Sequence, residues 1–140
     1  MKSKIKFYRR KIVIPVENGE EARYYSDLMY ASFLKPHCLL HFSDGAEYQV
    51  KISVRTLLKH LPEKPFFQCN RTDIINLCYY EKHDSEKQRL ILQGGYKFGL
   101  SVRCNTKFGK KKAYMQCLSP PCPKCIDCNK EKCKDYLQRL

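Results

Sequence analysis

The stretch that most constrains the fold is Phe66–Leu77, in which a short polar segment lies between two apolar ones. Its apolar residues include Phe66, Phe67, Ile74 and Ile75, and its polar residues include Gln68, Asn70, Arg71 and Thr72. Polar side chains held between buried anchors lose little entropy on binding, so this segment could present hydrogen-bonding groups to a partner. The simpler interpretation, which composition alone favours, is a plain strand–turn–strand unit in which Asn and Thr only serve the turn.

The charge of the chain indicates a polyanionic partner. Its 140 residues carry 27 Lys and Arg against 14 Asp and Glu, a net charge of +13. Nucleic acid is the first candidate and a membrane surface the second. We expect no membrane partner, because the sequence has no apolar run of transmembrane length and no clear amphipathic basic helix. The basic N-terminus is not followed by a signal-peptide core, which predicts a cytoplasmic protein.

Strand signals dominate the chain, and turn residues separate them. Besides the two strands of Phe66–Leu77, we expect strands at 4–16 (bent near 8–11), 38–42, 47–52, 79–83, 89–92 and 96–102. A short segment at 24–33 is expected to lead into the strand at 38–42, with an interruption at Lys35-Pro36. Turns are expected at Asn18-Gly19, Asp44-Gly45 and Gly94-Gly95. The predicted fold is therefore mostly β (α+β), with antiparallel strands in small packed sheets and two helices.

The two helices are predicted from caps and apolar spacing. The apolar face of the first comprises Val54, Leu57, Leu58 and Leu61, at positions i, i+3, i+4 and i+7. Ser53 is expected to cap this helix and Pro62 to end it. Ser101 is expected to cap a second helix that begins near Arg103. Its buried edge would comprise Phe108, Met115 and Leu118.

The end of the chain differs in composition from the rest. Four of its nine cysteines crowd together after Pro120-Pro121, namely Cys122, Cys125, Cys128 and Cys133. We therefore expect a domain at 1–118 and a Cys-rich tail at 119–140. Four thiolates at short spacing suit a tetrahedral Zn²⁺ site, the one cofactor that the sequence suggests. An iron–sulfur cluster fits less well, because the fourth Cys is one residue late, and adventitious thiols remain a third interpretation.

Two further cysteines flank the central stretch. Cys69 and Cys78 are expected to be small core residues, although Arg71 could lower the pKa of the Cys69 thiol and make it redox-sensitive. Asn76, between two apolar residues, is expected to bond local backbone. No Cys–His or Ser–His–Asp arrangement and no phosphate-binding Gly loop is indicated, so we do not expect an enzyme.

Taken in order, these pieces resemble the LytTR family of bacterial DNA-binding domains, over roughly 12–114. The most specific parts are Leu61-Pro62, then Phe-Phe-x-Cys-x-Arg-Thr-x-Ile-Ile-Asn-Leu, then a Gly-Gly turn and Leu-Ser-Val-Arg. The resemblance implies a transcriptional regulator that places loops, rather than a recognition helix, into successive major grooves of duplex DNA. It also suggests binding to repeated half-sites as two copies, with a homodimer on DNA.

The resemblance assigns base contacts to His37, Arg71 and Arg103. An Arg fork can bond O6 and N7 of guanine together, and phosphate contact is the alternative for both Arg residues. The other expected DNA-binding residues are Asn70, Thr72, Ser101, Lys107, Lys110 and Lys111, the lysines as contacts to the DNA backbone.

The chain departs from the family pattern within the central stretch. Asn70 stands where His is common, Gln68 where Arg is common and Asp73 where an aromatic residue is common. The carboxylate of Asp73 would repel phosphate if it faced DNA. We also expect no receiver domain, because the sequence starts directly with the DNA-binding part.

Two alternatives remain open at this point. One is a metal- or redox-sensing regulatory protein that acts through the C-terminal Cys cluster. The other is a basic RNA-binding protein, although the strands lack the paired exposed aromatics of common single-strand readers.

Overall fold

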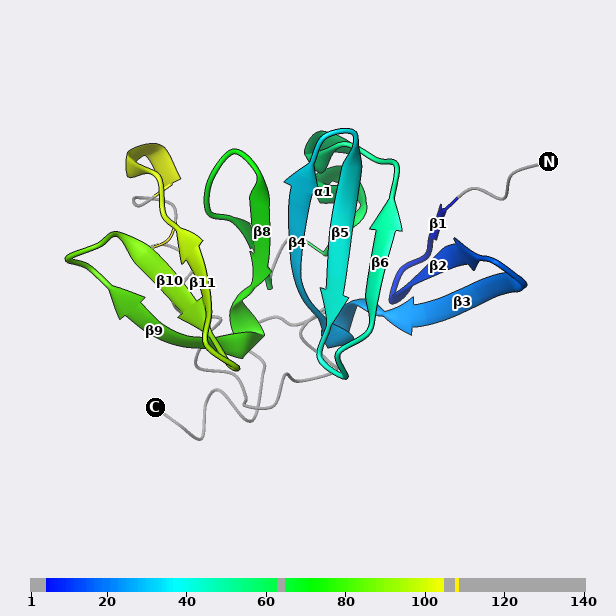
Figure 1. The fold of residues 1–140 in the computed structure, drawn as a ribbon, viewed down its shortest axis with the longest axis horizontal. Coiled ribbons are helices and arrows are strands. Elements are labelled where there is room, and N and C mark those ends of the chain that lie inside the picture. The colour runs from blue at the N-terminus through cyan, green and yellow to red at the C-terminus, as the bar shows by residue number, and fades with distance from the viewer. Residues whose placement is uncertain (1–4, 63–64, 105–107, 109–140) are drawn as a thin grey trace.

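The computed structural model describes residues 5–62, 65–104 and 108, which form three antiparallel sheets in a row (Figure 1). The first sheet comprises β1 (Lys6–Phe7), β2 (Lys11–Val16) and β3 (Gly19–Tyr24). The central sheet, in the order β6-β5-β4-β8-β7, comprises β4 (Leu28–Leu34), β5 (His37–Phe42), β6 (Glu47–Val50), β7 (Phe66–Gln68) and β8 (Asp73–Asn76). The third, in the order β11-β10-β9, comprises β9 (Tyr80–Asp84), β10 (Arg89–Leu92) and β11 (Tyr96–Gly99). The helix α1 spans Val54–His60, and single 3-10 turns at Tyr25–Asp27 and Leu77–Tyr79 connect the sheets.

Both faces of the central sheet are buried, which explains its consecutive apolar residues. Phe66 and Ile74 belong to a core shared with β2 and α1. Phe67 and Ile75 belong to a second core, shared with β10 and β11. Because neighbouring residues of a strand point to opposite faces, two adjacent apolar residues fit a strand covered on both sides. The mostly β prediction and the strand–turn–strand prediction for Phe66–Leu77 are both confirmed.

The N-terminal part differs from the single bent strand expected over 4–16. The chain reverses there, because the Tyr8 N–H donates to the Lys11 carbonyl at 2.9 Å, and Phe7 pairs with Ile12 between β1 and β2. The strand β3 was not predicted, since its sequence Gly-Glu-Glu-Ala-Arg-Tyr has no apolar alternation. Pairing with β2 along its whole length supplies its hydrogen bonds, while its side chains stay mostly exposed.

The first predicted helix is confirmed as α1. The Ser53 hydroxyl accepts a hydrogen bond from the Thr56 N–H at 3.1 Å, which satisfies one of the free donors of the first turn. Leu57 and Leu61 are buried in the first core, and Val54 and Leu58 pack against it.

The second helix begins as expected from its cap. Residues 102–104 are helical, and the Cys104 N–H donates to the Ser101 hydroxyl at 3.2 Å. Phe108 is buried, as predicted, whereas Met115 and Leu118 lie outside the described residues. The strand expected over 96–102 is shorter than predicted and ends at Gly99.

Candidate nucleic-acid interface

Three loops from separate parts of the chain meet at one edge of the molecule, the top of Figure 1. They are the β4–β5 turn (35–36), the β7–β8 loop (69–72) and the start of the second helix (101–104), and we call this surface the loop edge. The Phe33 N–H donates to the Thr72 carbonyl at 2.8 Å, and the Ser101 N–H donates to the Cys69 carbonyl at 3.0 Å. The β7–β8 loop is therefore the middle of the three, bonded to β4 just before the β4–β5 turn on one side and to the start of the second helix on the other.

Asn70 fixes the conformation of the β7–β8 loop. Its Oδ1 accepts hydrogen bonds from the backbone N–H groups of Thr72 at 2.9 Å and Asp73 at 3.0 Å. An Asn side chain that bonds the backbone two residues ahead closes a tight turn. Arg71 lies inside this turn and is exposed. The Arg71 side chain therefore extends into solvent from a backbone whose conformation is already fixed.

Asp73 is turned toward the domain rather than outward. One carboxylate oxygen accepts from the Ser32 hydroxyl at 2.7 Å and the other from Asn70 Nδ2 at 2.8 Å. The same Nδ2 donates to the Gly99 carbonyl at 2.7 Å, at the end of β11. The concern that Asp73 would repel phosphate assumed an outward-facing carboxylate, and here both of its oxygens are engaged.

The structure brings the three residues predicted to contact bases to the loop edge. His37, Arg71 and Arg103 are all exposed, and none of their side chains has a hydrogen-bond or ion-pair partner among the described residues. Their predicted DNA contacts remain predictions, as do those of Asn70, Thr72 and Ser101.

The other predicted DNA-binding side chains are either engaged locally or not described. The Thr72 hydroxyl donates to Asn70 Oδ1 at 3.1 Å, and the Ser101 hydroxyl caps the second helix. Lys107, Lys110 and Lys111 lie outside the described residues.

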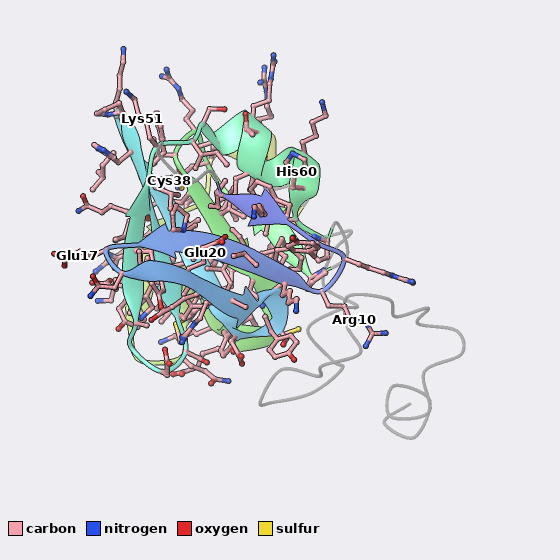
Figure 2. All side chains as sticks on the ribbon, turned by 90° about the vertical axis from the view of Figure 1, so that its right-hand side faces the viewer. Arg10, Glu17, Glu20, Cys38, Lys51 and His60 are labelled. Carbon is pink, nitrogen blue, oxygen red and sulfur yellow. The ribbon has the colours of Figure 1, made fainter. Side chains whose placement is uncertain are left out.

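Sequence reasoning missed that Lys51 belongs to the loop edge. Cys38 pairs with Val50 between β5 and β6, so one further step along the two strands places Lys51 beside His37. Figure 2 shows Lys51 at the same upper edge, where many nitrogen-tipped side chains project. Lys35 and Arg55, from the β4–β5 turn and from α1, are exposed as well. The hairpin register was the signal that could have identified Lys51.

Several carboxylates of the described residues contact basic side chains outside the three loops. These pairs are Lys6–Glu20 at 3.6 Å, Arg23–Asp44 at 2.6 Å, His41–Glu47 at 2.8 Å and Arg89–Asp84 at 3.8 Å. They lie on the first sheet, in the β5–β6 hairpin and in the third sheet. Positive charge on the loop edge is therefore left available to attract a polyanion.

The cysteines of the central region are core residues. Cys38, Cys69 and Cys78 are buried. Burial raises the pKa of the Cys38 thiol to about 11 and raises that of Cys69 as well, with the Asp73 carboxylate adding to both shifts. The alternative that Arg71 lowers the pKa of the Cys69 thiol for redox sensing is therefore wrong. Desolvation outweighs the charge of an exposed neighbour.

Brief treatment of the native protein with iodoacetamide at about pH 8 should leave Cys38 and Cys69 unmodified, because the thiolate is the reactive form. Peptide mass spectrometry measures the modification at each site. Cys104, which is partly exposed, is the internal control and should be modified first. In guanidinium all three should react alike, and native modification of Cys69 as fast as Cys104 would contradict the burial argument.

Within the residues that the structure describes, no group of three or more His, Cys, Asp or Glu side chains could hold a metal ion. The predicted zinc ligands, Cys122, Cys125, Cys128 and Cys133, lie outside those residues, as does the predicted boundary between 118 and 119. The described part of the chain also contains no helix that is long and apolar enough to cross a bilayer.

Comparison with known proteins agrees with this arrangement. The family profile of the LytTr DNA-binding domain matches residues 24–113. A solved LytTr DNA-binding domain from Bacillus cereus has a similar fold, with a TM-score of 0.64 at 18% sequence identity, over 74% of this chain and 96% of that one. No curated protein sequence matches the chain. Because the family profile spans more than half of the sequence, the chain belongs to the LytTr DNA-binding domain family.

Proposed function

We propose that this protein is a sequence-specific transcriptional regulator that binds duplex DNA by inserting the loop edge into the major groove. The observation that carries the proposal is the meeting of His37, Arg71 and Arg103 on one exposed edge of a LytTr-family domain. Such a regulator would act in the bacterial cytoplasm.

The proposed contacts divide into base reading and phosphate binding. Arg71 is the central reader, because its loop is fixed by Asn70 and held between the two outer loops. A planar guanidinium on a fixed backbone can bond O6 and N7 of guanine in a defined register. Lys35, Lys51 and Arg55 surround the readers and would neutralise phosphates, which positions the protein without reading sequence.

Two copies of the protein are proposed to occupy repeated half-sites. One loop edge carries few reading side chains, so a single copy can specify only a short sequence. A second copy on a repeat, one or more helical turns away, would supply the remaining specificity. We further propose that Lys107, Lys110 and Lys111 contact the DNA backbone and that Cys122, Cys125, Cys128 and Cys133 bind Zn²⁺.

Selection from a random duplex pool tests the proposal, and we expect enrichment of a defined, repeated motif. Arg71→Ala and Arg103→Ala should then each relax the preference at defined base positions. The expected loss of discrimination there is about 5- to 150-fold, the equivalent of one bidentate base contact. Competition binding with single-base variants of the selected site measures it.

Two variants serve as controls for this experiment. Lys51→Ala should weaken binding to all duplexes alike and lower the slope of log affinity against log salt by about one unit. Lys82→Ala removes the same charge in the middle of β9, opposite Ile91. It should change neither the affinity for duplexes nor the slope of log affinity against log salt. Absence of a motif, or preference for structured RNA at matched salt, would overturn the proposal. Uniform weakening by Arg71→Ala would make Arg71 a phosphate contact.

A further inference from the structure

Two aliphatic side chains stand exposed on the loop edge. Val102 is 91% exposed and Leu34 is 67% exposed, and the other large hydrophobic side chains that are exposed in the described part are all tyrosines. Tyrosine has a hydroxyl that water can bond, whereas Val and Leu have no polar atom. Neither Val102 nor Leu34 contributes to a core cluster.

Each of these side chains lies beside one of the proposed base-contacting residues. Leu34 ends β4 and pairs with His37 across the β4–β5 turn. Val102 is the first helical residue after Ser101 and directly precedes Arg103. The two outer loops of the loop edge therefore each present one apolar and one hydrogen-bonding side chain. The middle loop, with Arg71, lies between them.

The major groove offers one apolar feature that such a side chain could recognise. Thymine carries a C5-methyl group there, and aliphatic side chains contact it, while the neighbouring base edges offer hydrogen-bonding atoms. Contact between the methyl group and Val or Leu removes both from water. The exposed cations around these side chains, Lys35 and Lys51 among them, favour a nucleic acid over an apolar protein surface as the occupant.

We propose that Leu34 and Val102 are specificity-determining residues that read thymine methyl groups on either side of the base contacted by Arg71. This inference rests on the proposed function, because it requires that the loop edge enter the major groove. It adds that thymines, and not only hydrogen-bonding edges, define the site.

Replacement of single thymines by deoxyuracil tests the inference, because only the methyl group is removed. Within the selected site, we expect one sensitive thymine near each outer loop. Replacing either of these thymines alone should weaken binding by the wild-type protein about three- to fivefold, as expected for one lost methyl contact. Replacement of other thymines should have no effect. Val102→Ala should remove the sensitivity at one of the two positions and Leu34→Ala at the other.

The controls separate this inference from the proposed function. Arg71→Ala should leave both methyl sensitivities in place, and Tyr24→Ala, at an exposed residue of β3, should leave the whole pattern unchanged. Val102→Thr keeps one of the two methyl groups of the side chain, so it should retain part of the sensitivity that Val102→Ala loses. Specific binding that is insensitive to every deoxyuracil would overturn the methyl inference and leave the proposed function standing. Absence of specific binding by the wild type would overturn both.

Discussion

An Asn70→Ala variant should lose about 10- to 100-fold of its affinity for the selected DNA site while keeping its affinity for unrelated duplexes. Asn70 Oδ1 holds the backbone N–H groups of Thr72 and Asp73, and Nδ2 connects the loop to Asp73 and to Gly99. Without these bonds the backbone of the loop would be free to change conformation and would have to become ordered on binding. The backbone position from which the Arg71 side chain extends would then vary. The cationic groups of the edge stay in place, so non-specific affinity should not change.

Competition binding against the selected and a scrambled duplex measures this effect. Asn18→Ala makes the same chemical change in the exposed turn between β2 and β3, and it should bind both duplexes as the wild type does. Asn70→Asp keeps Oδ1 but places a second carboxylate against Asp73, and it should bind the selected site no better than Asn70→Ala. If Asn70→Ala discriminated as well as the wild type, the loop would not depend on this side chain.

The second large effect concerns stability. Asn76→Ala should lower the free energy of unfolding by about 3 kcal/mol, because it leaves two buried backbone groups without partners. Asn76 is 1% exposed, its Nδ2 donates to the Leu28 carbonyl at 3.0 Å, and its Oδ1 accepts from the Cys78 N–H at 2.9 Å. These bonds connect β4 to the turn that leads from the central to the third sheet.

Urea denaturation with an unchanged m value measures this loss. Gln49→Ala, at an exposed residue of the edge strand β6, should change the free energy of unfolding by no more than about 0.5 kcal/mol. Asn76→Asp should be at least as damaging as Asn76→Ala, since it loses the donor and buries a charge. A loss as small as that of Gln49→Ala would mean that water or backbone movement satisfies both groups.

Local signals predicted the elements of the domain well. The Asp44-Gly45 and Gly94-Gly95 turns, the Ser53 cap and the apolar face of α1 all act between residues a few positions apart, so they can be recognised in the sequence. The scaffold role of Asn76 was predicted on the same basis, because a polar side chain between Ile75 and Leu77 must find backbone partners. The hairpin of β1 and β2 was missed, because a turn at Tyr8–Lys11 lacks the usual turn residues.

By itself, the sequence determined that Phe66–Leu77 is a polar turn between two apolar strands, and it named the residues of that turn. Only the tertiary structure decided which way they face. Asp73 turns inward because Ser32, on a strand far away in sequence, lies within hydrogen-bonding distance. Lys51 joins the loop edge through the pairing of β5 with β6, and the pKa of the Cys69 thiol rises because the thiol is buried and desolvated. The direction in which a side chain points, its burial and its neighbours depend on contacts between segments that are distant in the sequence. The pattern of adjacent residues does not encode those contacts.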